Sequence, residues 1–187
     1  MNHRHALILI AVLLWQSAAH AADDPARAAS TPGFISELRL GILAHDPLSP
    51  ERGTADFHGQ VLFARPTFAA GIPALAVPRP HLGGALNSSG KTSHLHAGLT
   101  WTFDITKTVF VEIGLGGALH SGKTANIAPA GRNALGCPAH FRESLGVGYR
   151  IDANWSLIGT LEHLSNAGLC KHNRGLTNIG VSLGYQF

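Results

Sequence analysis

Short stretches of apolar–polar alternation recur along almost the whole chain, separated by residues typical of turns. Strand side chains point alternately to the two faces of a sheet, so this period of two predicts strands with one apolar and one polar or small face. Beyond residue 22 no stretch has clear helical periodicity. We expect eight strands, at Ile35–His45, Asp56–Ala64, His81–Asn87, Thr92–Phe103, Val109–His120, Phe141–Ile151, Trp155–Ser165 and Thr177–Phe187. The pattern therefore predicts an all-β fold, an eight-stranded antiparallel barrel.

Charges of both signs lie on the polar face, and they indicate which face points inward. In the narrow lumen of a small barrel such charges can neutralise one another, while the Leu, Val, Phe and Trp face meets lipid. The final strand alternates in the same way and ends on the aromatic Phe187. We therefore expect a transmembrane β-barrel, with a soluble lipocalin-like barrel as the alternative. The expected lumen charges are Glu37, Arg39, Glu112, Arg142, Arg150 and Glu162.

The first 21 residues have the pattern of a secretory signal peptide. Arg4 gives a positive start, Ala6–Trp15 is apolar, and Ala19-His20-Ala21 offers a small-residue cleavage site. This apolar run is too short to cross ~30 Å of hydrocarbon as a helix. We expect residues 1–21 to be removed and residues 22–187 to form the barrel. The formal net charge of +3 and the lack of a basic run do not indicate a nucleic-acid partner.

An even number of strands places both chain ends at the periplasmic end of the barrel. The short turns at 104–108 and 152–154 are then periplasmic, and the connections at 87–91, 121–140 and 166–175 are extracellular. Cys137 and Cys170 lie in two of the extracellular loops. Because a disulfide persists in this oxidising setting, we expect the two cysteines to be bonded.

His163 and Ser165 continue the lipid-facing stripe at the extracellular end of their strand. Residues at i and i+2 of a strand point the same way, about 7 Å apart. A histidine within reach of a serine can accept the hydroxyl proton and activate the oxygen as a nucleophile. Both residue types are also common where a strand meets the membrane interface. The spacing alone leaves both explanations open.

The stretch His163-Leu164-Ser165-Asn166-Ala167-Gly168, with Asn173-Arg174-Gly175 and the final strand, resembles the active-site region of the lipid A 3-O-deacylase family. Members of that family are outer-membrane barrel esterases that remove the acyl chain at position 3 of lipid A. The family signature is a histidine, any residue, then Ser-Asn near the end of the penultimate strand. The resemblance extends more weakly over residues 34–187, including Gly90–Ser93 and Phe141–Ser144.

This resemblance implies that Ser165 is the nucleophile and His163 the general base. It also implies an oxyanion hole from the loop that follows, where Asn166, Gly168 and Asn173 match the family's loop positions. Asn173 is the best side-chain candidate. Turn chemistry explains Asn166 and Gly168 as well, and for Asn166 the two explanations are of equal weight.

One position departs from the family. Its best-known members carry a glutamate at the start of the last strand to orient the histidine, and Thr177 stands there in this chain. Ile151 and Trp155 flank a three-residue turn, and if they pair, His163 faces Glu143. We therefore expect Glu143 to be the orienting acid, with an interface glutamate reaching water as the alternative. A bulge would shift this register. Glu162 is adjacent in sequence but faces the lumen, which excludes it.

His94, His96 and His120 share the inward face near the extracellular end and could bind a metal ion. Such residues more often pack a polar barrel interior, so we expect no metal and no other cofactor. The expected substrate is the lipid A of lipopolysaccharide, reached laterally from the membrane. Two alternatives stay open: a non-catalytic structural or adhesive barrel, and a hydrolase of another membrane lipid. The sequence does not decide the oligomeric state, a homodimer included, or the acyl-chain preference.

Overall fold

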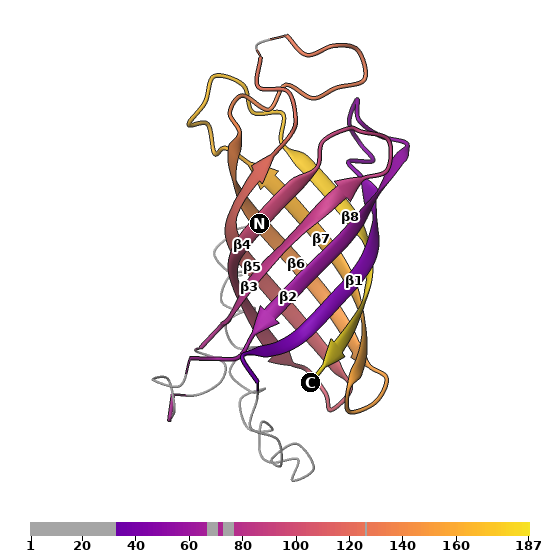
Figure 1. Cartoon of the computed structure of the whole chain (residues 1–187), viewed down its shortest axis with the longest axis vertical. Helices are drawn as coiled ribbons and strands as arrows, with labels where there is room; N and C mark the ends of the chain where they lie inside the picture. Colours follow the sequence, from indigo (N-terminus) through magenta and orange to yellow (C-terminus); the bar gives the residue numbers. More distant parts are fainter. Residues whose placement is uncertain (1–32, 67–70, 73–76, 126) are drawn as a thin grey trace, which may run out of the picture.

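The computed structural model describes residues 33–66, 71–72, 77–125 and 127–187. Consecutive antiparallel strands close into a barrel in which the first strand pairs with the last (Figure 1). The strands are β1 (Ile35–His45), β2 (Thr54–Phe63), β3 (Arg79–Asn87), β4 (His94–Asp104), β5 (Val109–His120), β6 (Ala139–Arg150), β7 (Trp155–Ser165) and β8 (Leu176–Gln186). The predicted eight-stranded barrel is confirmed. The predicted signal peptide lies outside the described residues.

Strand β3 begins two residues before its predicted start, at Arg79. Pro80 pairs with Leu99 of β4, but β2 pairs with β3 only from His81 onward. The missing N–H of Pro80 therefore faces no partner on β2, and proline is tolerated at such a strand end. The Pro-rich sequence before His81 had concealed this start.

The barrel carries its large apolar side chains on the outside. Leu40, Leu95 and Leu119 are each more than 60% exposed. At the end of β7 and β8 nearest the C-terminus, the rings of Trp155, Tyr185 and Phe187 contact one another edge to face, with centroids 4.9 and 5.2 Å apart. An apolar outer band edged by aromatic rings is the surface of a barrel surrounded by lipid. Among the described residues, no helix is long and apolar enough to cross a membrane.

The lumen is filled with paired charges, as predicted. Arg39 contacts Glu37 and Glu112, each at 2.6 Å, and Arg79 contacts the same two carboxylates at 2.7 and 3.1 Å. These two cations and two anions compensate one another, which a buried charge requires. Arg79 was not predicted as a lumen residue, because it precedes the expected strand.

A second group of lumen charges lies farther along the barrel. Arg142 pairs with Glu162 at 2.8 Å.

Arg150, expected in the lumen, instead lies at the β6–β7 turn with its side chain 21% exposed and bonded to Asp104. Its strand ends there, so the inward face opens toward solvent.

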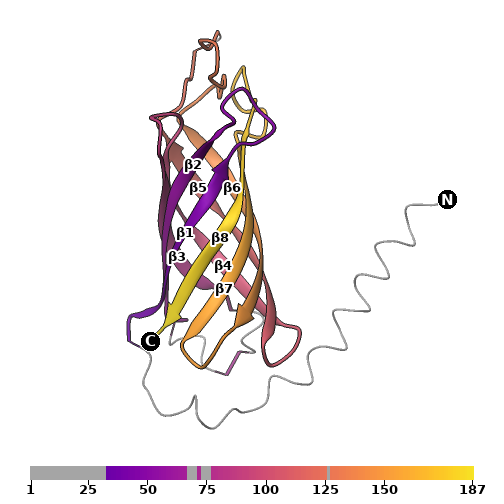
Figure 2. The same cartoon turned by 90° about the vertical axis from the view of Figure 1, so that its right-hand side faces the viewer.

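Connections 46–53, 88–93, 121–138 and 166–175 gather at one end of the barrel, called here the loop end, and the C-terminus lies at the other (Figure 2). Cys137 and Cys170 form a disulfide, as predicted, which ties two of these loops together. The three connections predicted to be extracellular, at 87–91, 121–140 and 166–175, therefore all lie at one end of the barrel.

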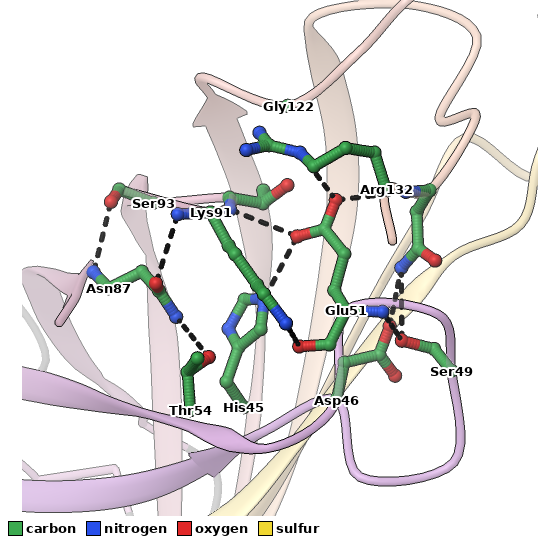
Figure 3. A network of polar contacts seen from close by, with 12 residues as sticks. His45, Asp46, Ser49, Glu51, Thr54, Asn87, Lys91, Ser93, Gly122 and Arg132 are labelled. Atoms are coloured by element: carbon green, nitrogen blue, oxygen red, sulfur yellow. Dashed lines mark hydrogen bonds and ion pairs between the residues drawn. The ribbon is translucent and has the colours of Figure 1, made fainter. Parts of the chain in front are cut away.

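Glu51 organises the loop end (Figure 3). Its carboxylate accepts hydrogen bonds from the backbone N–H groups of Thr92 (3.0 Å) and Asn133 (2.9 Å) and lies 3.0 Å from His45 Nε2. Arg132 approaches it at 3.3 Å. Burial alone would raise the pKa of Glu51, but the bonds from His45, Asn133 and Thr92 outweigh burial and lower that pKa to about 2. One ionised carboxylate thus joins three loops.

Candidate active site at the loop end of β7 and β8

His163 and Ser165 lie at the last positions of β7 on the outer face, next to Leu161. The inward-facing residues that alternate with them, Glu162 and Leu164, are buried, whereas His163 and Ser165 are half-buried. The alternation of the strand therefore brings the two side chains to one side of the barrel wall, as predicted. No hydrogen bond among the described residues joins Ser165 to His163. Catalytic contacts of this kind are often long before substrate binds.

The ring of His163 is held by Thr177. His163 pairs with Thr177 across β7 and β8, and His163 Nδ1 lies 2.8 Å from Thr177 Oγ1. The threonine oxygen accepts this hydrogen bond when Nδ1 carries the proton. Nε2 then keeps the lone pair that a general base requires. The position that departs from the family is thus the one that contacts the histidine.

Glu143 occupies the predicted register but makes no such contact. It pairs with His163 across β6 and β7, as the three-residue turn indicated. Its side chain is exposed on the outer face, and among the described residues it has no hydrogen bond to His163. Since Nδ1 is already bonded to Thr177, the geometry favours Thr177 over Glu143 as the orienting group.

Asp46 lies on the other side of Thr177, and sequence reasoning missed it. Its carboxylate accepts a hydrogen bond from the Thr177 backbone N–H at 3.1 Å and another from Asn133 Nδ2 at 2.5 Å. Its own N–H donates to Asn178 Oδ1 at 3.1 Å. Asp46 is 5% exposed and has a positive φ of 38°. The Asp46 carboxylate is therefore hydrogen-bonded to the backbone of the residue whose side chain contacts His163.

Gly175 leaves the room that the histidine ring occupies. A Cβ at this position would lie 2.9 Å from His163 Cε1 and 3.4 Å from His163 Nε2. The backbone φ of 72° also belongs to the left-handed region, which glycine adopts without strain. Both observations explain why a glycine follows Arg174.

The loop after Ser165 is stabilised by Asn166. Its Nδ2 donates to the carbonyl oxygens of Leu135 (2.9 Å) and His172 (2.6 Å), and its Oδ1 accepts from the Gly168 N–H (2.9 Å). The side chain of Asn166 and the N–H of Gly168 are therefore already used within the loop. This is the turn chemistry that the sequence left open for both residues.

Asn173 is placed differently. Its Oδ1 accepts a hydrogen bond from the Asn166 backbone N–H at 3.0 Å, which fixes the amide plane. The side chain is exposed, and its Nδ2 has no partner among the described residues. Of the three predicted oxyanion candidates, Asn173 is the one with an available side-chain donor.

A cavity of about 300 Å³ adjoins Thr177. Apolar side chains of β7 and β8 form one part of its wall, and the loop after β1 forms another. Arg174 adds a positive charge. The lining residues are Asp46, Pro47, Leu48, Ser49, Leu161, Arg174, Thr177 and Ile179. Such a wall suits a ligand with an apolar chain and an anionic group.

A protein-family model described as "Lipid A 3-O-deacylase (PagL)" matches residues 75–186, more than half of the chain. The search of curated proteins found no match to this chain. Among solved structures, the crystal structure of the outer membrane enzyme PagL is similar, with a TM-score of 0.61 and 16% identity over 81% of this chain and 100% of that chain. A structure from the de novo design of transmembrane β-barrels has a TM-score of 0.54 and 13% identity over 84% and 98% of the two chains. At these identities the structural likeness shows the barrel fold alone.

Proposed function

This chain belongs to the lipid A 3-O-deacylase (PagL) family of the outer membrane, and on that premise we propose that it is a serine esterase that removes the 3-O-linked acyl chain from lipid A. The observation that carries the proposal is the pair His163 and Ser165 on the outer face of β7, with the Nδ1 atom of the histidine held by Thr177. A lipid-facing site suits a substrate whose acyl chains stay in the bilayer.

In the proposed reaction Ser165 Oγ attacks the ester carbonyl carbon while His163 Nε2 accepts the hydroxyl proton. The tetrahedral intermediate then expels the sugar 3-oxygen, which takes that proton from His163. This leaves an acyl group on Ser165. Water then attacks the carbonyl carbon of the acyl-enzyme, and His163 accepts a proton from the water. The bond to Ser165 Oγ breaks, Ser165 Oγ takes this proton from His163, and the fatty acid is released.

The negative charge on the ester oxygen needs a donor during both steps. Asn173 is the candidate donor, because its Nδ2 has no partner among the described residues. The backbone N–H of Asn166 holds the other end of the same amide through Oδ1. A single donor of this kind is worth roughly 3–4 kcal/mol of transition-state stabilisation.

The histidine becomes positively charged in each step, and no carboxylate of the described residues contacts it directly. Thr177 orients the ring through Nδ1. Asp46, which accepts a hydrogen bond from the Thr177 backbone N–H, supplies the negative charge that stabilises the charged imidazole. We regard Asp46 as a positioning residue that acts through Thr177. This arrangement replaces the glutamate of the best-known family members and leaves no need for Glu143.

The cavity beside Thr177 supports the choice of substrate. Leu161 and Ile179 offer an apolar wall to a fatty acyl chain, and Arg174 offers a cation to a phosphate. Lipid A carries both groups.

The experiment is mass spectrometry of lipid A from cells that express the wild type or Ser165→Ala at equal outer-membrane levels. Loss of one 3-hydroxyacyl group with the wild type alone supports the proposal. Unchanged lipid A in both, with the barrel correctly inserted, contradicts it and favours a non-catalytic barrel. Release of fatty acid from another membrane lipid by the wild type alone would instead identify a different substrate.

A further inference from the structure

Histidines crowd the lumen below the loop end. His58 of β2, His81 of β3 and His94 and His96 of β4 all point inward, and each is at most 4% exposed. His96 is central, with ring centroids 5.4 Å from His94, 5.5 Å from His81 and 5.9 Å from His58. The mechanism proposed above uses none of them.

Most of their ring nitrogens have no hydrogen-bond partner in the described protein. Both nitrogens of His94, both of His96, and Nε2 of His58 and of His81 are buried and unpaired. The remaining nitrogens bond to hydroxyl groups, His58 Nδ1 to Ser182 and His81 Nδ1 to Thr100. Buried polar atoms are nearly always satisfied, because each one left unpaired destabilises the fold. The clustering of so many unpaired imidazole nitrogens at one place indicates a ligand.

One acidic group lies among these rings. A ring nitrogen from each of His94 and His96 and a carboxylate oxygen of Glu162 lie within 4.8 Å of one another. His94 Nε2 is 3.4 Å from Glu162 Oε1, without the geometry of a hydrogen bond. Two imidazoles and one carboxylate form a ligand set that Zn²⁺ favours.

We propose that His94, His96 and Glu162 bind a divalent transition-metal ion, of the class that prefers imidazole ligands, inside the barrel. Ligand atoms on one tetrahedral zinc ion are about 3.4 Å apart, so the widest pair, at 4.8 Å, must approach by roughly 1.4 Å. In the proposed site, rotation of the two imidazoles supplies this movement. His58 and His81 are next in reach and complete the coordination directly or through water.

The surroundings of Glu162 fit this role. Arg142 bonds only Oε2 of the carboxylate, and Asn178 donates one hydrogen bond to Oε1 at 3.0 Å. Oε1 therefore keeps a lone pair for the ion, while Arg142 and Asn178 fix the direction of the carboxylate. Such outer contacts commonly orient metal ligands. The ion would join β4 to β7 across the lumen and thus stabilise the closed barrel.

His120, which shares the inward face of this end, is not part of the cluster. Its Nε2 lies 2.7 Å from the carbonyl oxygen of Cys137, and its Nδ1 accepts a bond from the Gly122 N–H at 3.1 Å. The metal trio considered from the sequence, His94, His96 and His120, is therefore replaced by His94, His96 and Glu162. This also makes His120 a matched control.

The test is to refold the full barrel with Zn²⁺ present, desalt it into metal-free buffer and measure bound zinc by mass spectrometry. We expect an equimolar amount in the wild type and in His120→Gln, and loss of zinc to background in His94→Gln and His96→Gln. Refolding with Co²⁺ adds the visible absorption of a tetrahedral site. Each barrel is checked for folding by its gel mobility without heating.

The wild-type measurement stands even if a variant fails to fold. No retained metal in the folded wild type would overturn the proposal and leave the imidazoles to ordered water. Equal retention in the wild type and in folded His96→Gln would overturn it as well. Neither result bears on esterase activity, which is read from lipid A.

Discussion

The backbone N–H of Thr177 donates a hydrogen bond to the carboxylate of Asp46, so a buried acid lies next to the residue that holds His163. In the best-known family members one glutamate combines both roles. In the mechanism proposed for this chain, a hydroxyl group orients the ring and a separate carboxylate supplies the charge. Two side chains from distant parts of the sequence thus replace one.

The division of roles predicts opposite effects of one mutation in two backgrounds. In the wild type, Asp46→Asn keeps an acceptor for the Thr177 N–H but removes the charge, and we expect kcat to fall about tenfold. In Thr177→Glu a carboxylate contacts the histidine directly, so Asp46→Asn should be neutral or beneficial because it relieves repulsion. Deacylation rates of the four proteins measure the coupling. Equal losses in both backgrounds would show that Asp46 is merely structural.

Gly175 is expected to be needed for the position of the ring. Gly175→Ala places a Cβ against His163, and a displacement of this kind costs up to about 100-fold in kcat. Gly90→Ala is the matched control, because Gly90 has a similar φ of 68° but open space around it. Both variants should lose similar stability, while only Gly175→Ala loses activity. Similar activity in the two variants would contradict the assigned contact.

Glu143 is expected to be dispensable. Glu143→Gln should leave the deacylation rate within a few-fold of the wild type, because Thr177 already occupies the Nδ1 atom of His163. Thr177→Val should lower the rate about 5- to 10-fold, the value of one hydrogen bond. Thr177→Ser keeps the hydroxyl group and serves as the control. The reverse ranking of Glu143→Gln and Thr177→Val would restore Glu143 as the orienting acid.

Glu51 predicts a stability difference that depends on pH. Its pKa in the folded protein is about 2, below the ordinary 4.5, so the ionised form stabilises the fold. That stabilisation, on the order of 3 kcal/mol, is complete above about pH 5 and is lost as the pH falls toward 2. Glu51→Gln should therefore be less stable than the wild type at pH 7, and the difference should shrink below pH 4.5. Folded fractions in urea across this range provide the measurement. A difference independent of pH would contradict it.

The barrel and part of the site were predictable from the sequence because both depend on local rules. Alternation within each strand set the two faces, and it placed His163 and Ser165 together at the end of β7. The three-residue turn after Ile151 was enough to predict that Glu143 pairs with His163. These features need only neighbouring residues or one tight hairpin.

The rest of the site depends on contacts that no local rule contains. Asp46 ends up beside Thr177 because β1 pairs with β8, which brings together residues 131 positions apart. Asn166 was ambiguous because the role of its side chain depends on the carbonyl groups of His172, later in the same loop, and of Leu135, in another loop. An aspartate directly after a strand also looks like an ordinary turn residue, so the sequence carried no signal for Asp46.

The pairing of β1 with β8 has a consequence for when the proposed esterase can act. Ser165, His163 and Thr177 come from the last two strands to be synthesised, whereas Asp46 follows the first. The site therefore straddles the seam at which the cylinder is sealed. With this seam open, Asp46 is not yet beside Thr177, and the proposed site is incomplete. We therefore expect the proposed esterase to reach its full rate only once β1 and β8 have paired, in the membrane that holds its substrate.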